Sequence, residues 1–128
     1  MARIKFVLEY DFGKVPISLL WQFIYTNSGL ERWYADEVTN KGSDYTIVWN
    51  DDPHEATLLS SRQESHVRFH WKEDGDEPTY FEMRILVSEL THGRTLKVTD
   101  FASDADEVEE FTDLWNNSVD QLKRNLGI

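Results

Sequence analysis

The sequence offers few side chains that could do chemistry, and the first candidate is the carboxylate of Asp100. It shares strand parity with Leu96 and Val98, so a strand that turns these two inward would turn Asp100 inward as well. A buried carboxylate needs a partner, and without one its pKa would rise. Inside the protein it could orient a polar group of a ligand. The plainer interpretation, which we favour, is that the strand ends first and Asp100 is solvated.

The histidines do not predict a metal site. His66 and His70 lie on one face of a predicted strand. Four residues along a strand span about 13 Å, which is too far for two ligands of one ion. The other two histidines fall in predicted turns. On this face we expect cross-strand charge pairs among Arg68, Glu82 and Arg84, exposed to solvent, and we expect no metal and no other cofactor.

Other motifs that carry chemistry are missing from the sequence. The acidic stretches 51–52, 73–77 and 104–110 lack the spacing of a calcium loop with its distal Glu. No nucleophile elbow or phosphate loop frames the Ser, His and Asp residues, and there is no cysteine to act as a thiolate. The sequence therefore predicts no catalytic residue, and the expectation is a protein that is not an enzyme.

The composition and net charge of the chain limit the kinds of partner that it could bind. The 128 residues suit one domain, and 40% hydrophobic with 13% aromatic residues argues for a packed core. Thirteen basic against twenty-four acidic residues give a net charge of −11, which repels phosphate backbones and anionic lipid. Nucleic acid and membrane insertion are therefore poor expectations. With no apolar signal segment and no long apolar run, a cytoplasmic protein is expected.

A long helix is predicted near the C-terminus, from about Asp104 to Leu126, and the other elements are expected to pack around it. Two pairs can cap its start, Asp104 with Glu107 or Ser103 with Asp106. Its apolar residues recur every three or four positions and form one stripe, which needs a long apolar surface to lie on. The stripe consists of Val108, Phe111, Trp115, Val119, Leu122 and Leu126.

The preceding chain predicts that this surface is a sheet. Alternation predicts a first strand over 4–12, and helical spacing then predicts two short helices, the second opened by a capping box of Ser28 and Glu31. Because Leu58 and Leu59 are adjacent, alternation does not decide which side of the strand 55–62 faces the core. Short loops require an antiparallel meander, with one apolar face beneath the long helix and one solvated face. The later strands are expected near 37–39, 45–49, 55–62, 66–71, 81–87 and 96–98.

Several short segments, in their order and spacing, resemble one known family. They are Leu30-Glu31-Arg32-Trp33, Phe69-His70-Trp71, the run 95–101, Leu114-Trp115 and the run 119–122. Together they resemble the helix-grip superfamily of START-like domains, in the branch named after the activator of heat-shock-protein-90 ATPase. The resemblance implies an α+β domain over residues 1–128. Its curved antiparallel sheet of about six or seven strands would grip the last helix.

The resemblance also implies a cavity between sheet and helix, which in this superfamily often takes an apolar ligand. The expected function is a non-enzymatic domain that binds a small apolar or amphipathic molecule there. A competing interpretation is that the same aromatic residues only fill the core, which the sequence leaves open. The predicted cavity residues are Trp33, Trp49, Phe69, Trp71, Phe81, Met83, Ile85, Val98, Asp100, Phe111, Trp115 and Val119.

Two alternatives from other functional classes remain. A protein-interaction domain, either a chaperone accessory or a homodimer, would show an exposed apolar patch, with Tyr34 and Trp49 as candidates. An enzyme of the cyclase or hydrolase kind seen elsewhere in the superfamily would need polar groups that converge inside the cavity. The sequence supplies only Asp100, Tyr10 and Tyr45 for that purpose, so this alternative ranks last.

Overall fold

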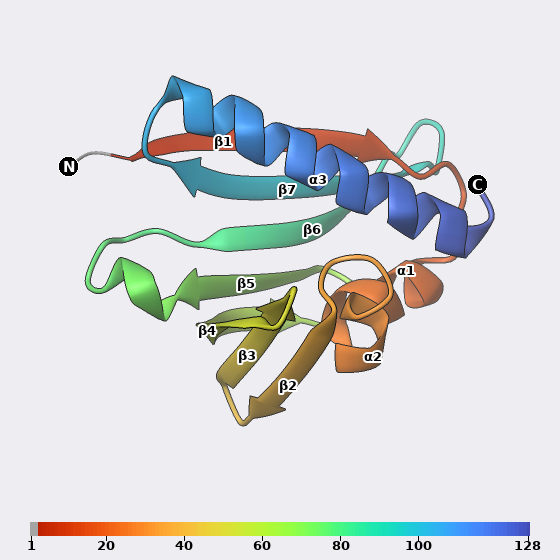
Figure 1. The fold of residues 1–128 in the computed structure, drawn as a ribbon. Helices are drawn as coiled ribbons and strands as arrows, with labels where there is room; N and C mark the ends of the chain where they lie inside the picture. The colour runs from red at the N-terminus through yellow and green to blue at the C-terminus, as the bar shows by residue number, and fades with distance from the viewer. Residues whose placement is uncertain (1–2) are drawn as a thin grey trace.

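Seven strands form one curved antiparallel sheet in the computed structural model, which describes residues 3–128 (Figure 1). The strand order is β1-β7-β6-β5-β4-β3-β2, so the two short helices after β1 carry the chain from one edge of the sheet to the other. The predicted α+β helix-grip arrangement is confirmed. The elements are β1 (Ile4–Asp11), α1 (Ile17–Tyr25), α2 (Asn27–Leu30), β2 (Glu37–Lys41), β3 (Asp44–Trp49), β4 (Asp52–Arg62), β5 (His66–Trp71), the 3₁₀ turn η1 (Lys72–Asp74), β6 (Phe81–Val87), β7 (Arg94–Ala102) and α3 (Ala105–Leu126).

The long helix α3 lies across the sheet as predicted, and it is anchored unevenly. Of the two possible caps the first one forms, because the Asp104 carboxylate accepts the Glu107 N–H at 2.8 Å. The fully buried side chains of α3 are Trp115, Val119 and Leu122, all from the middle of the helix onward. No side chain of residues 105–114 is fully buried. The first half of α3 therefore stands away from the sheet.

The start of α2 differs from the prediction. The N-cap of α2 is Thr26, whose hydroxyl accepts the Gly29 N–H at 2.9 Å, so the predicted capping box of Ser28 and Glu31 is wrong. Thr26 has the extended backbone that an N-cap requires, whereas Ser28 already lies inside the helix. The Glu31 carboxylate instead accepts the Val38 N–H at 2.9 Å and ties this turn to β2.

A β-bulge explains the two adjacent leucines of β4. The register between β4 and β5 shifts between Leu58 and Ser60, so the intervening Leu59 is an extra residue. Leu58 packs against the core, whereas the side chain of Leu59 is 52% exposed. The sequence did not show which of the two leucines faces the core. The extra residue answers this, because the side chains after Leu59 alternate again from a new starting point.

The outer face of the sheet carries the predicted charge pairs, but their central residue is not solvated. Glu82 is only 4% exposed and lies 2.8 Å from the Arg68 guanidinium and 3.1 Å from that of Arg84. The Arg68 guanidinium also lies 4.0 Å from the ring centre of Tyr80. Burial acts to raise the pKa of Glu82, but the hydrogen bonds from both arginines outweigh it and hold that pKa below its ordinary value.

We expect Glu82→Gln to lower the free energy of unfolding by about 1.5 kcal/mol near neutral pH, because it leaves two arginines without their counter-charge. The estimate is below that for a fully buried pair because both arginines are about one-third exposed. Urea unfolding measures the change, with Glu89→Gln in an exposed turn as the control. Since the pKa of Glu82 is lowered in the folded state, this contribution must disappear as the pH falls through that pKa. Equal losses in the two variants would contradict the prediction.

Candidate functional site

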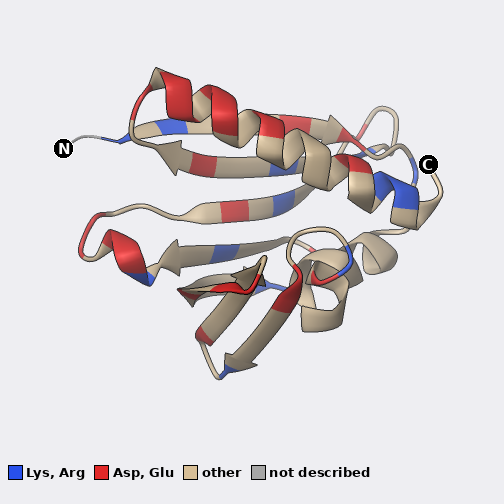
Figure 2. Cartoon of the chain, in the orientation of Figure 1, with Lys and Arg blue, Asp and Glu red and all other residues tan. Residues whose placement is uncertain are grey.

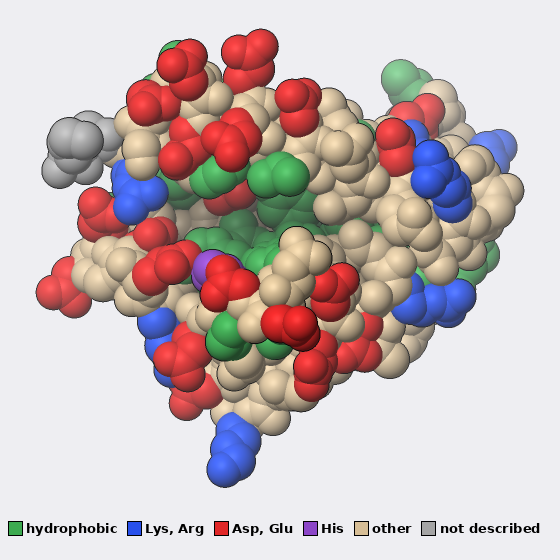
Figure 3. All heavy atoms as spheres, in the orientation of Figure 1, with side chains coloured by type: hydrophobic (Ala, Val, Ile, Leu, Met, Phe, Trp, Pro, Cys, Tyr) green, Lys and Arg blue, Asp and Glu red, His purple; other side chains and the backbone are tan. Residues whose placement is uncertain are grey.

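A groove of about 890 Å³ opens between α3, from Glu107 to Gln121, and the segment that follows α2 (Figure 3). In the space-filling view its hydrophobic floor lies at the centre of the molecule, below the ridge formed by α3. The ends of β3 and β5 complete its walls. Its aromatic lining consists of Trp33, Tyr34, Trp49, Trp71, Tyr80, Phe101, Phe111 and Trp115. A second hollow of about 580 Å³, beside the loop 11–16, has one aromatic residue, Phe12, in its lining alongside aliphatic ones.

The aromatic rings of the groove are packed against one another. The ring of Tyr34 stacks on Trp115 with centroids 5.3 Å apart and meets the edge of Trp49 at 5.2 Å. Trp71 stacks on Phe81, which lies behind it in the core, at 4.8 Å. Such contacts fix ring orientation in addition to burying area. The wall of the groove is therefore formed in advance of any ligand.

The indole N–H groups fix the same wall to the backbone. Trp33 Nε1 donates to the carbonyl of Phe23 at 2.8 Å, and Trp49 Nε1 donates to the carbonyl of Tyr34 at 2.6 Å. These bonds satisfy the polar atoms that tryptophan must bury with its ring. They also hold the segment after α2 against α1 and β3, so the groove keeps its width.

Asp100 lies at the groove and not in solvent, so the interpretation favoured from the sequence is wrong. Strand β7 continues to Ala102 because β1 pairs with it to the end, with Phe6 opposite Asp100. The carboxylate accepts Trp115 Nε1–H at 2.9 Å and the Phe101 N–H at 2.8 Å. Burial raises the pKa of Asp100 to about 6, against the effect of these two hydrogen bonds.

Tyr34 brings a second polar group to the same place. Its side chain is 9% exposed and lines the groove, so the prediction of an exposed apolar patch at Tyr34 is wrong. Trp49, the other candidate for that patch, is half-buried in the groove wall. Within residues 3–128 the Tyr34 hydroxyl has no hydrogen-bond partner. Burial, and then the charge of Asp100, raises the pKa of Tyr34 well above its ordinary value, so the phenol stays neutral.

The predicted cavity residues divide into two groups. Six line the groove: Trp33, Trp49, Trp71, Asp100, Phe111 and Trp115. The other six are buried in the core and do not line it: Phe69, Phe81, Met83, Ile85, Val98 and Val119. Sequence reasoning missed Tyr34, Tyr80 and Phe101 as lining residues. The sequence did contain an indication for Tyr34, because it directly follows Trp33, the last residue of a segment that resembles the family.

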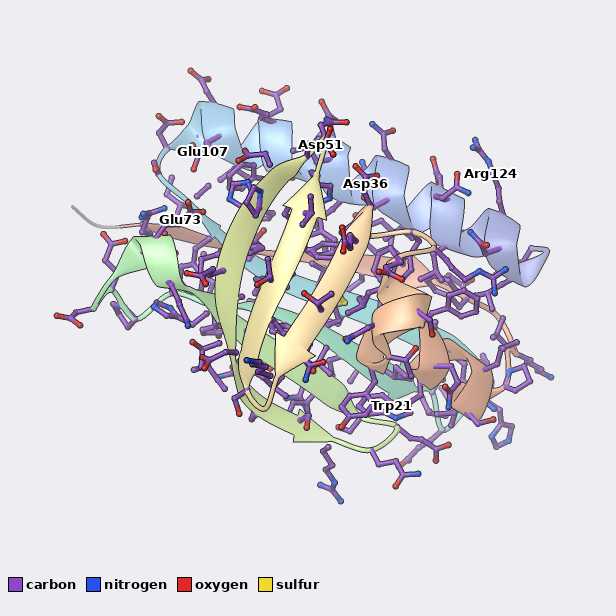
Figure 4. All side chains as sticks on the ribbon, turned by 60° about the horizontal axis from the view of Figure 1, so that its bottom comes forward. Trp21, Asp36, Asp51, Glu73, Glu107 and Arg124 are labelled. Atoms are coloured by element: carbon purple, nitrogen blue, oxygen red, sulfur yellow. The ribbon has the colours of Figure 1, made fainter. Side chains whose placement is uncertain are left out.

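The charged residues that line the groove are mostly acidic, and acidic positions also predominate along the first turns of α3 and around η1 (Figure 2). Six lining residues are acidic and two are basic, which leaves an excess of four negative charges. Figure 4 labels three of the carboxylates, Glu107 at the start of α3, Glu73 in η1 and Asp36 before β2. The lining charges are Glu31, Asp36, Glu73, Asp74, Asp100 and Glu107 against Arg3 and Arg32.

The other polar residues considered for catalysis lie elsewhere. The Tyr10 hydroxyl donates to the Asn116 side chain at 2.7 Å, and the ring of Tyr45 packs edge-on against Phe69. Neither tyrosine lines the groove. No three His, Cys, Asp or Glu side chains of residues 3–128 come together as they would around a metal ion. None of the helices described is both long and apolar enough to cross a bilayer.

Comparison with known proteins points to one family. The family model described as a START-like superfamily domain matches residues 1–128. A Bacteroides fragilis protein solved by NMR is 36% identical, with 100% of this chain and 94% of that chain covered and a TM-score of 0.68. No curated protein matches the chain.

More distant structures share the fold. The Aha1 dimer of Colwellia psychrerythraea is 14% identical, with 94% of this chain and 93% of that chain covered and a TM-score of 0.74. The CalU16 protein of Micromonospora echinospora is also 14% identical, with 95% and 75% covered and a TM-score of 0.73. At this identity the likeness concerns the fold alone.

Proposed function

Because the chain belongs to the START-like superfamily, we propose that it is a non-enzymatic binding domain whose groove holds a small apolar or amphipathic ligand. The ligand would lie between the sheet and the first half of α3, against the aromatic wall. Trp115 lines this groove and packs against Phe81 in the core behind it.

The observation that carries this proposal is the volume and chemistry of the groove. At about 890 Å³ it lies within the range of about 300–1,000 Å³ typical of small-molecule sites. Such sites combine an apolar, largely aromatic lining with a few fixed polar groups. Here the aromatic residues supply the lining, and Asp100 and Tyr34 supply the polar groups. A wall already fixed by indole hydrogen bonds lowers the entropy lost when a ligand binds.

A groove-filling variant tests the proposal. Ser118 is half-buried on the groove side of α3, so Ser118→Phe would occupy the space of a ligand. The matched control is Asp113→Phe, which adds the same ring at an exposed position of the same helix that does not line the groove. With N-phenyl-1-naphthylamine as a neutral fluorescent probe, we expect Ser118→Phe to weaken binding at least about tenfold, or about 1.4 kcal/mol. We expect Asp113→Phe to bind as the wild type does.

The location of the probe is read from the indole N–H resonances in ¹H–¹⁵N NMR spectra. Trp33, Trp49, Trp71 and Trp115 line the groove, whereas Trp21 lies outside it and serves as an internal reference. Shifts at the groove indoles, with Trp21 unchanged, would support the proposal. Absence of binding, or equal binding by both phenylalanine variants, would refute the site.

A further inference from the structure

We propose that the ligands of this groove are amphipathic organic cations, with an ammonium group held at Asp100 and Tyr34 and an apolar body held against the aromatic wall. This inference rests on the proposed function, since it assumes that the groove is a ligand site. It adds the charge of the ligand, which the fold alone does not indicate.

The first argument is the unused capacity of the Asp100 carboxylate. Each of its oxygens accepts one hydrogen bond, one from Trp115 Nε1 and one from the Phe101 backbone. A carboxylate oxygen has two acceptor positions, so each has one left for a group in the groove. In residues 3–128 no Lys, Arg or His forms an ion pair with this carboxylate. An ammonium ion would supply both the missing hydrogen bonds and the missing counter-charge.

The second argument is that the two basic residues of the groove are already engaged. The Arg3 guanidinium lies 3.3 Å from the Asp74 carboxylate and 2.9 Å from that of Glu77. The Arg32 guanidinium lies over the ring of Phe23, 5.3 Å from its centre. An anionic ligand would therefore meet six acidic residues and one guanidinium, that of Arg32, without a carboxylate partner in residues 3–128, whereas a cation would be attracted by the combined field of the acidic residues.

The third argument is the Tyr34 side chain. It is nine-tenths buried and lines the groove, its ring stacks on Trp115, and its hydroxyl has no hydrogen-bond partner in the part of the chain described. The phenol oxygen can accept a hydrogen bond from an ammonium group. Aromatic faces also attract cations through their ring quadrupoles, most strongly where water is excluded. Carboxylate, phenol and aromatic faces together form the chemistry that recognises an amine.

A purely structural role does not require the charge of Asp100. A protonated Asp100 would keep both contacts in place, whereas an asparagine offers its one carbonyl oxygen either to Trp115 Nε1 or to the Phe101 N–H. The raised pKa of Asp100 indicates that the ionised form is disfavoured in the free protein. Ionised groups held in such unfavourable surroundings are frequent at binding sites, where the ligand supplies the compensation.

Three naphthalene compounds of nearly equal size test the role of charge. They are 2-naphthylmethylamine, which is a cation near neutral pH, the neutral 2-naphthylmethanol, and the anion 2-naphthoate. By calorimetry we expect the amine to bind about tenfold more tightly than the alcohol, and the carboxylate to bind more weakly than both. Asp100→Asn should lose about tenfold in amine affinity and leave alcohol affinity unchanged. The control Asp113→Asn removes one charge from the exposed side of α3 and should change neither affinity.

Equal affinity of wild type for the amine and the alcohol would overturn the proposal. Equal affinity of wild type and Asp100→Asn for the amine would also overturn it. In either case the proposed function stands if the alcohol still shifts the indole resonance of Trp115. Failure of the amine to bind at all would overturn the inference, and the separate titration with the neutral N-phenyl-1-naphthylamine then decides on the proposed function. If Asp113→Asn lost as much affinity for the amine as Asp100→Asn, the effect would come from the net charge of the protein and not from the site. That result would also overturn the proposal.

Discussion

Trp115→Ala is expected to lower the free energy of unfolding by about 4 kcal/mol, the largest effect expected of any substitution discussed for this protein. The indole is 6% exposed, and its ring lies within 6.5 Å, centre to centre, of the rings of Trp33, Tyr34 and Phe81. Truncation removes these contacts from the middle of α3. It also leaves the Asp100 carboxylate without the indole donor, which burial makes costly.

Denaturant unfolding measures this effect, and two further variants divide it. Trp115→Phe keeps an aromatic ring and loses the N–H, so it should cost about half as much as the alanine variant. Leu114→Ala changes the neighbouring residue, whose side chain is 57% exposed, and should cost less than about 0.5 kcal/mol. If Trp115→Ala lost no more than Leu114→Ala, the view that Trp115 joins α3 to the sheet would be untenable.

Asp100→Asn is expected to raise the free energy of unfolding by about 2 kcal/mol at about pH 8. The folded-state pKa of about 6 lies above the ordinary value of 3.8, so the folded protein binds this proton more tightly than the unfolded chain does. The wild type therefore gains stability as the pH falls from about 6 to about 4, and it loses stability as the pH rises through that range. Asparagine cannot ionise, so the variant does not lose stability as the pH rises. Above about pH 6 the variant is therefore more stable than the wild type.

The measurement is a set of urea unfolding curves from about pH 8 down to about pH 4, where the advantage of the variant should vanish. Asp113→Asn, on the exposed side of α3, controls for the general effect of removing one negative charge. Glu82 does not obscure the result, because its lowered pKa places its own loss of stability at lower pH. A variant less stable than the wild type at about pH 8 would mean that the fold already compensates the Asp100 charge.

Taken with the amine experiment, this prediction links stability to binding. The same substitution that stabilises the free protein should weaken the binding of an organic cation. Such opposite effects are common at binding sites, where a group kept in unfavourable surroundings is satisfied only by the ligand. A variant that gained stability and kept its affinity for the amine would leave the charge of Asp100 without a function in binding.

Local patterns in the sequence predicted much of the fold. The period of α3 and the pair Asp104 and Glu107 predicted the helix and its start, because both depend on residues within one or two turns. The strands followed from alternation for the same reason. The cap of α2 failed because Thr26 and Ser28 are both suitable residue types, and the backbone conformation that decides between them is set by the packing of α1.

The candidate site was less predictable, because it depends on contacts between distant segments. Alternation correctly turned Met83 and Val98 inward, but it does not tell a filled interior from a hollow one. Asp100 was assigned to solvent because nothing near it in the sequence shows that β1 extends the pairing of β7 to Ala102. The groove exists because the first half of α3 stands away from the sheet, and that distance follows from the whole fold.

Because α3 is attached unevenly, one part of the helix packs on the core and another part covers the groove. From its middle onward the helix closes the core through Trp115, Val119 and Leu122, while the turns before Trp115 cover the groove without a fully buried side chain. Partial unwinding of the first turns would therefore expose the groove without exposing the core, at a free energy well below that of global unfolding. A guest molecule can enter or leave through such a local opening while the rest of the protein keeps its native packing.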